Sequence, residues 1–436
     1  MKRPFHLELQ TTRVTDAAFG GQTALDGHRL TVARAEIEAL VLADPRIASA
    51  EVEIARPGES ARIVHCLDAI EPRVKAAGPG CAFPGFLGGT ETVGRGVTAR
   101  LAGLSVMTAS RYPQPFSGLL AAREAIVDMS GPAALYSPFS RIINLVLSLA
   151  PQPGTVHITD NHDYDDAVRR AGLLVADRLA RLALGREPDE TTVFDFSARE
   201  PSLPNVAYFY QAQGQGPMAD TYLYGRTIEN LVPTLIHPGE VMDGALVSGV
   251  HVYSCFKNPT YLHQNNPIIW ELQARHGQDL NFVGVILNRG HNYTQMEKER
   301  SSYWAAKLAG LLEADGVILT AEGGGNSAID MMLACKFMEQ AGIKTTLLSY
   351  ESAGADGRDF PLFYSVPEAD AVVSVGSDSE RVALPRVERV IGGDFLLDPS
   401  TGSGRTPAIG PLEIGMYYLY CAINQLGANV LAGRQF

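Results

Sequence analysis

The last third of the chain alternates apolar runs with amphipathic segments, and this alternation constrains the fold more than any other feature of the sequence. Apolar runs at 281–287, 316–321 and 344–350 are separated by segments with helical spacing at 298–314 and 327–340. Strands that alternate with helices are typical of a parallel sheet buried on both faces. We therefore expect an α/β fold with doubly wound, mostly parallel sheets.

The first part of the chain has a different pattern of apolar and polar residues, which suggests more than one domain. Short β-like runs punctuated by Gly and Pro fill residues 1–105 and predict a small β-rich N-terminal domain. Longer helical stretches mixed with apolar runs follow over 106–254, and the regular alternation occupies most of 255–436. Because 436 residues exceed one typical core, two or three domains are expected, and we place the boundaries at these positions.

Charge and hydropathy argue against nucleic-acid and membrane partners. Lys and Arg total 36 against 48 Asp and Glu, a net charge of −12, and no basic run could neutralise a phosphate backbone. The start of the sequence turns polar where a signal peptide needs roughly 7–15 apolar residues. The most apolar segment, 142–150, has about half the length of a membrane-spanning helix. We therefore expect a cytoplasmic protein.

The residues that commonly bind metals do not form a recognised metal site. The five cysteines are scattered without CxxC spacing, which predicts neither a disulfide framework nor a zinc site. The acidic segment TDNHDYDDAVRR at 159–170, with His157 just before it, has the right residue types. However, Asp and Asn also begin helices, and Asp165 and Asp166 in a first turn suit the helix dipole. We predict a helix start there and no metal.

Two loops are expected at the strand ends where parallel sheets bind their ligands. One is AEGGGNS at 321–327, which precedes a helix whose first N–H groups are free to bind an anion or a carboxylate. Its glycines match neither the dinucleotide fingerprint nor the phosphate loop, so a tight turn with an anion site is the better interpretation. We expect Glu322, Gly324 and Asn326 to bind and orient a polar substrate.

The other loop is the turn SCFKNP, which follows a predicted strand ending at Ser254. A cysteine such as Cys255 is most simply a small buried side chain. A strained Xaa–Cys peptide at a strand end can instead undergo attack of the sulfur on the preceding carbonyl. Elimination and hydrolysis would then leave a pyruvoyl group, whose electrophilic carbonyl can capture an amine. We expect this turn and the loop 321–327 to line one cleft.

Long stretches of the sequence resemble a known family. The strings EVEIARPGESARIVHCLDAIEPRVK, PTLIHPGEVMDGALVSG and CFKNPTYLHQNNPIIWEL, together with KERSSYWAAKLAGLLEADG, are similar to the precursor subunit of component B of glycine, sarcosine and betaine reductases. A more distant resemblance is to the D-proline reductase proprotein. The family resemblance implies an oxidoreductase subunit that acts on C–N bonds of small amino acids or N-methylated amines and is active only with a partner.

The same resemblance implies a cofactor, partners and site residues. A cysteine becomes a pyruvoyl group after internal cleavage, a partner subunit of component B carries a thiol or selenol, and the protein forms oligomers. We expect Cys255 to carry the electrophile and Ser254 the scissile carbonyl. The matching stretch also contains expected substrate neighbours, namely Glu240, Asp243, Asn258, His263, Asn265 and Asn266.

Two alternatives to cleavage at Cys255 remain open. If the processed position lies four residues upstream, His251 stands there, and a histidine cannot become a pyruvoyl group. The protein would then be a non-processed homologue that uses the same cleft, with Cys255 as a thiol nucleophile or His251 as an acid or base. The other alternative is a non-catalytic scaffold subunit whose catalytic residues all lie on the partner.

Overall fold

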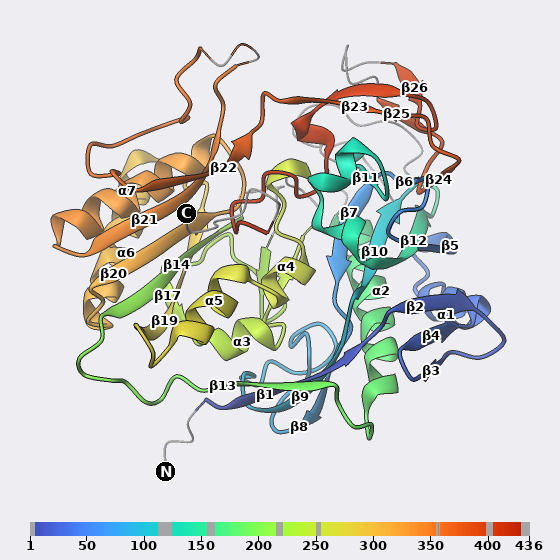
Figure 1. The fold of residues 1–436 in the computed structure, drawn as a ribbon, viewed down its shortest axis with the longest axis horizontal. Coiled ribbons are helices and arrows are strands. Elements are labelled where there is room, and N and C mark those ends of the chain that lie inside the picture. Colours follow the sequence, from blue (N-terminus) through green and yellow to red (C-terminus); the bar gives the residue numbers. More distant parts are fainter. Residues whose placement is uncertain are drawn as a thin grey trace.

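The computed structural model in Figure 1 describes residues 5–111, 124–154, 162–214, 221–249, 254–354, 356, 358–397 and 404–428. Its largest sheet has six strands in the order β17-β19-β14-β20-β21-β22. Their bounds are β17 Thr234–Ile236, β19 Asn281–Gly290, β14 Asn205–Gln213, β20 Gly316–Ala321, β21 Lys344–Glu351 and β22 Val372–Ser377. The strands from β19 to β22 are parallel, and β17 pairs antiparallel at the edge.

Helices cover both faces of this sheet. Successive side chains of each strand point to opposite sides, so neighbouring residues pack against different helices. Ala207 and Phe209 of β14 pack into one apolar cluster with residues of α6 (Gln295–Leu311) and α7 (Asn326–Gln340). Tyr208 and Tyr210 pack into another with residues of α4 (Thr260–Gln264) and α5 (Pro267–Arg275). The predicted mixed α/β class is confirmed, whereas the doubly wound arrangement stays a prediction.

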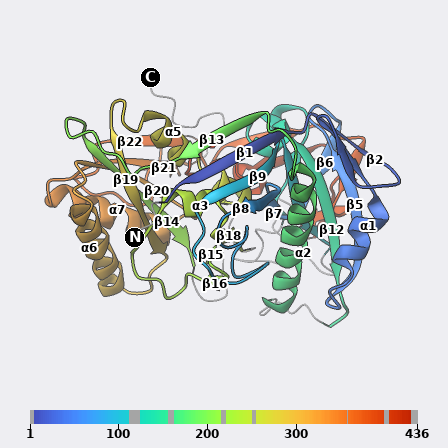
Figure 2. The ribbon, with the colours of Figure 1, turned by 90° about the horizontal axis from the view of Figure 1, so that it is seen from below.

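The N-terminal half contains two four-stranded mixed sheets, in the orders β13-β1-β9-β8 and β5-β12-β10-β7. The first comprises β13 Glu190–Phe194, β1 Leu7–Arg13, β9 Gly96–Ala102 and β8 Arg73–Ala77. The second comprises β5 Ile47–Ala55, β12 Ile143–Pro151, β10 Leu104–Ser110 and β7 Cys66–Ile70. Figure 2 shows α2 (His162–Ala180) beside these strands, at the opposite end of the molecule from α6.

Smaller elements connect the sheets. Three-stranded sheets are formed by β16-β15-β18, β2-β4-β3 and β11-β6-β24, and two-stranded sheets by β23-β27 and β25-β26. The strands are β2 Asp16–Phe19, β3 Ala24–Asp26, β4 Arg29–Val32, β6 Ala61–Ile63, β11 Val127–Asp128, β15 Thr221–Leu223, β16 Arg226–Thr227, β18 Leu246–Ser248, β23 Arg381–Leu384, β24 Arg389–Ile391, β25 Phe395–Leu397, β26 Arg405–Pro407 and β27 Leu412–Gly415. The remaining α-helices are α1 Arg34–Val41 and α3 Pro238–Met242, and the 3-10 helices are η2 Pro132–Leu135, η3 Pro138–Arg141, η4 Arg181–Ala183, η5 Ser254–Phe256 and η6 Met416–Tyr418.

Segments far apart in the sequence share sheets. Strand β7 pairs with β10, and β14 pairs with β19, so strands with residues on both sides of positions 105 and 254 belong to common sheets. The three predicted domains stay a prediction. Strand β24 pairs in parallel with β6, which brings the C-terminal segment against the N-terminal half, as Figure 1 shows.

The acidic segment at 159–170 begins α2 within its described part. Asp163 and Asp165 lie in the first turn of this helix, and Asp166 pairs with Arg46 at 3.1 Å. His157 lies outside the described residues. Among the helices that the structure describes, none is long and apolar enough to cross a membrane.

Candidate functional site

The turn that carries Cys255 lies inside the protein. The strand predicted to end at Ser254 is present only over Leu246–Ser248, as β18, and Ser254 lies instead in the short helix η5, Ser254–Phe256. Residues 250–253, with His251, lie outside the described residues. Cys255 is fully buried in an apolar cluster that includes Tyr350. Burial, followed by the nearby charge of Asp378, raises the pKa of the Cys255 thiol well above its usual value.

Backbone hydrogen bonds fix the peptide between Ser254 and Cys255. The Ser254 carbonyl accepts the N–H of Cys421 at 2.7 Å and the N–H of Lys257 at 3.4 Å. The Cys255 carbonyl accepts the N–H of Ile423 at 3.1 Å. Cys421 adopts a left-handed backbone, with φ of 63°, which is uncommon for a residue other than glycine. The short bond from Cys421 is of the kind that stabilises a developing oxyanion, whereas the long bond from Lys257 is the ordinary i to i+3 bond of η5.

Glu322 joins the loop after β20 to this turn. Its carboxylate accepts the backbone N–H of Asn258 at 3.1 Å and the hydroxyl of Thr221 at 2.8 Å. The backbone N–H of Gln213, at the end of β14, donates to the same carboxylate at 3.2 Å. Glu322 is completely buried, and this burial raises its pKa. Glu322 therefore connects the ends of the adjacent strands β14 and β20 with the start of β15 and the turn after η5.

Gly324 packs directly against the residue that follows Cys255. A Cβ atom placed on Gly324 would lie 2.8 Å from Cε2 of Phe256 and 3.0 Å from the hydroxyl of Tyr350. The two loops are therefore in contact through tight packing, but they follow strands of different sheets, β18 and β20, and the shared cleft stays a prediction. Asn326 begins α7, and its amide donates to the Asn292 carbonyl at 3.3 Å.

His263 and its neighbours form a buried polar chain on the α4 face of the sheet. The Asn258 amide donates to the hydroxyl of Tyr210 at 3.3 Å, and that hydroxyl contacts Nδ1 of His263 at 2.6 Å. Burial lowers the pKa of His263 to about 3, so the imidazole is neutral near pH 7. Asn266 caps α5 through its side-chain oxygen and donates to the Tyr208 hydroxyl at 3.1 Å.

Three of the predicted neighbours have partners elsewhere. Asp243 binds Lys75, Thr98 and the N–H of Gly94, and Asn265 accepts from Arg73 and Arg100 at 2.9 and 3.0 Å. Glu240 accepts from the Tyr224 hydroxyl at 2.6 Å and the His237 N–H at 2.7 Å. It also lines a cavity of about 340 Å³ near Gly284, toward the amino end of β19. These contacts do not include Glu322, and those of Asp243 and Asn265 are with residues of the N-terminal half.

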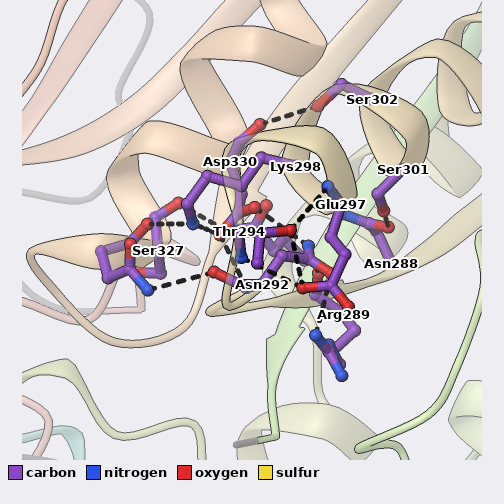
Figure 3. Close-up of polar contacts among 12 residues, drawn as sticks. Asn288, Arg289, Asn292, Thr294, Glu297, Lys298, Ser301, Ser302, Ser327 and Asp330 are labelled. Carbon is purple, nitrogen blue, oxygen red and sulfur yellow. Dashed lines mark hydrogen bonds and ion pairs between the residues drawn. The ribbon is translucent and has the colours of Figure 1, made fainter.

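A second polar cluster anchors the start of α7 beside the glycine loop. Figure 3 shows Lys298 of α6 pointing at Asp330 of α7, with the ammonium 2.9 Å from the carboxylate. Asn292, just after β19, donates to the same carboxylate from its backbone and its amide, at 3.2 and 2.9 Å. Ser301 donates to Asn288 at 2.7 Å. The cluster fixes the ends of β19, α6 and α7 relative to one another.

Several residues of the site carry no recognisable signal in the sequence. From the sequence, Tyr210 would be taken for a core residue of an apolar strand, and Lys257 for a solvent-exposed residue of a turn. The C-terminal residues Cys421, Asn424 and Gln425 are distant in sequence, yet Asn424 contacts Asn258, and Gln425 donates to the Gly323 carbonyl at 2.6 Å. They belong to the run of small and amide residues CAINQLGAN near the end of the sequence, which does not by itself indicate a contact with the turn.

Comparison with known proteins gives a consistent result. The family model described as glycine/sarcosine/betaine reductase component B subunits matches residues 5–433. A relative from Acetoanaerobium sticklandii, the glycine reductase complex component B subunits alpha and beta, is 39% identical over 440 residues, covering 99% of this chain and all of the relative.

Two relatives come from Peptoclostridium acidaminophilum. Its sarcosine reductase complex component B subunit alpha is 41% identical over 392 residues, which cover 88% of this chain and 89% of the relative. Its betaine reductase complex component B subunit alpha is 33% identical over 395 residues, which cover 88% and 87%. No solved structure matches the chain. The chain belongs to the family of glycine/sarcosine/betaine reductase component B subunits.

Proposed function

We propose that this chain is a subunit of a reductase complex that binds a small amino acid or an N-methylated amine for reductive cleavage of its C–N bond. The support is the family itself, because its members are named for reductases of glycine, sarcosine and betaine. The same names describe components of complexes, so the chain would act with a partner subunit that supplies a thiol or selenol. Glu322, Asn258 and His263 would surround the substrate.

We further propose that the chain cleaves itself between Ser254 and Cys255. The observation that carries this proposal is the pair of N–H groups, from Cys421 and Lys257, on the Ser254 carbonyl. The Cys421 N–H, at 2.7 Å, lies at the distance of an oxyanion donor, whereas the Lys257 N–H, at 3.4 Å, would have to move closer during the reaction. A second support is that one relative's name assigns two subunits, alpha and beta, to a single sequence aligned over its whole length.

The chemistry needs only the chain and water. The Cys255 sulfur attacks the Ser254 carbonyl carbon, the peptide C–N bond breaks, and a thioester and a free amine form. Elimination then breaks the Cβ–S bond, which leaves a thiocarboxylate on Ser254 and dehydroalanine at position 255. Hydrolysis of the dehydroalanine releases ammonia and leaves a pyruvoyl group. No electrons are gained or lost overall, so no oxidant is required.

The hydrogen bonds around the Ser254–Cys255 peptide support processing more than the thiol does. A pyruvoyl group would supply an electrophilic carbonyl. The acyl shift and a free-thiol mechanism both begin with attack by the Cys255 sulfur, and burial raises the pKa of this thiol in either case. What supports processing is the hydrogen bond from the Cys421 N–H to the Ser254 carbonyl, the group that the sulfur would attack.

Intact mass of freshly purified native protein tests the proposal. We expect denaturing electrophoresis to separate residues 1–254 from a blocked fragment that begins at the former Cys255, and carbonyl reagents to label only the second fragment. Cys255→Ala should give one full-length chain, because alanine has no nucleophile to start the acyl shift. Cys255→Ser could still cleave slowly, since a hydroxyl forms the analogous ester.

Cys335→Ala is the matched control, because Cys335 is also buried and lies on α7, away from the turn. This variant should be cleaved like the native chain. An intact native chain that supports activity in the complex and resists carbonyl reagents would contradict the pyruvoyl proposal. The non-processed homologue would then be preferred, and substitution of His251 within the active complex would separate it from a scaffold.

A further inference from the structure

The hydrogen-bond chain around His263 reaches only one nitrogen of its imidazole. The Tyr210 hydroxyl accepts the amide N–H of Asn258 and lies 2.6 Å from Nδ1 of His263, and we assign the hydroxyl's own proton to this contact with Nδ1. A neutral imidazole that accepts at Nδ1 carries its proton on Nε2. Among the residues that the structure describes, none accepts a hydrogen bond from this Nε2. Since His263 is fully buried, an N–H donor is left without an acceptor.

Lys257 is a second donor with unused capacity in the same region. Its side chain is 2% exposed, and its ammonium donates only to the Gly249 carbonyl, at 2.6 Å, within the described part of the chain. It forms no ion pair with a described residue. A buried ammonium is costly unless it is paired and hydrogen-bonded, so two free N–H bonds and a positive charge indicate a missing anionic partner.

The two donors belong to one short segment and are close enough to influence each other electrostatically. Lys257 lies six residues before His263, at the entry to α4, and its charge is, after burial, the second cause of the lowered pKa of His263. The charge of Lys257 also lowers the pKa of two nearby carboxyl groups, those of Asp68 and Glu322, against the larger effect of burial. Their oxygens accept from Thr260 and Ala69, and from Asn258, Thr221 and Gln213, instead of from Lys257.

We propose that Lys257 and His263 form a subsite for the carboxylate of the small amino-acid substrate. This deepens the proposed function and rests on it for the identity of the substrate. A carboxylate offers two oxygens, one for the ammonium and one for the Nε2–H of His263. Glycine, sarcosine and betaine differ in the methylation of their nitrogen and share the carboxylate. A subsite that holds this group keeps the nitrogen free for the reaction.

Tyr210 and Asn258 act as positioning residues in this arrangement. They touch the imidazole or its partner rather than the carboxylate of the substrate, and they hold the proton on Nε2. Without the Tyr210 hydroxyl, the neutral imidazole could carry its proton on either nitrogen. The Nε2–H donor would then no longer be fixed before the carboxylate binds. The neutral state of His263 means that the charge for carboxylate recognition comes from Lys257.

Acetate tests the subsite separately from cleavage, because it has a carboxylate but no amine to react with a carbonyl group. We expect calorimetric titration of the purified native protein, alone or in its complex, to show binding of acetate and at least tenfold weaker binding of acetamide. Lys257→Met and His263→Phe should each weaken acetate binding by roughly 10- to 100-fold, the effect of losing a charge-assisted hydrogen bond.

Two further variants distinguish loss of the subsite from misfolding caused by a buried substitution. His263→Gln places an amide N–H near the position of Nε2 and should restore most of the acetate affinity lost in His263→Phe. Lys344→Met removes the same charge from a side chain that is 83% exposed and should leave binding unchanged. Native protein that binds acetamide as well as acetate, or that binds neither, would overturn the subsite. Acetate binding by an uncleaved native chain would instead remove only the pyruvoyl proposal.

Discussion

At the scale of single residues, the clearest feature is the set of histidines that burial keeps neutral. Burial lowers the pKa of His263 to about 3 and those of His237 and His291 to about 4, against a usual value of 6.5. Each folded-state pKa lies below that of the unfolded chain. Between pH 6.5 and 4 the unfolded chain therefore binds more protons, and acid favours unfolding.

We predict that His263→Gln reduces the acid sensitivity of the protein. In the native chain the free energy of unfolding should fall as pH decreases from 6.5 toward 4, by up to about 1.4 kcal/mol per pH unit for each neutral histidine. The carboxyl group of Asp68, whose pKa burial raises to about 6, contributes with the opposite sign. Urea unfolding of both proteins at pH 7, 6 and 5 isolates the His263 contribution. Equal pH dependence in the two would show that His263 titrates normally.

At the scale of elements, the loop between β20 and α7 is packed too closely to accept a side chain at Gly324. We predict that Gly324→Ala lowers the free energy of unfolding by about 1–3 kcal/mol, because the added methyl group overlaps Phe256 and Tyr350. It should also slow any cleavage at Cys255, since Phe256 belongs to η5.

Gly310→Ala provides the matched control in the same sheet layer. Gly310 is exposed near the end of α6, and an added Cβ would meet nothing within 4 Å. Alanine there should stabilise the protein by about 0.5–1 kcal/mol through helix propensity. Chemical denaturation measures both variants. A neutral Gly324→Ala variant would mean that the two loops separate easily.

The elements were predictable from sequence where local pattern decides them. The apolar spacing of 298–314 indicates α6, but the helix begins earlier, at Gln295, because Thr294 and Glu297 form a capping box. The contact of Gly324 with the Cys255 turn does not follow from the rule that parallel strands end at one edge, because β18 belongs to the antiparallel sheet β16-β15-β18 and not to the six-stranded sheet. The donors from Cys421 and Ile423 could not be predicted, because a contact between distant segments leaves no local pattern. Similarly, Asp243 and Asn265 lie near the turn in sequence, but buried basic residues of the N-terminal half bind them.

At the scale of the whole molecule, Arg62 joins the two ends of the chain. It is fully buried, and its guanidinium forms a bidentate pair with Asp128 at 2.6 and 2.9 Å. The same group donates to the carbonyls of Pro385, Ala408 and Gly410. One side chain therefore holds β6, β11 and the C-terminal segment together.

We predict that Arg62→Met destabilises the protein by about 3–5 kcal/mol, because it leaves the Asp128 carboxylate buried without its partner. Limited proteolysis should then cut the segment after residue 378 first, since that segment loses three hydrogen bonds at once. Arg381→Met is the comparison, because the pair between Arg381 and Glu413 is exposed and should contribute less than about 1 kcal/mol. Similar losses for both variants would contradict the role given to Arg62.

The position of Cys421 and Ile423 over the carbonyls of Ser254 and Cys255 also sets an order of events in time. During synthesis the ribosome delivers the turn long before it delivers the residues that hold its carbonyls. On the cleavage proposed above, a growing chain would carry an intact but unactivated bond through most of translation. The reaction could begin only after the C-terminal segment has folded back onto the turn, so the completeness of the fold would itself control the moment of cutting.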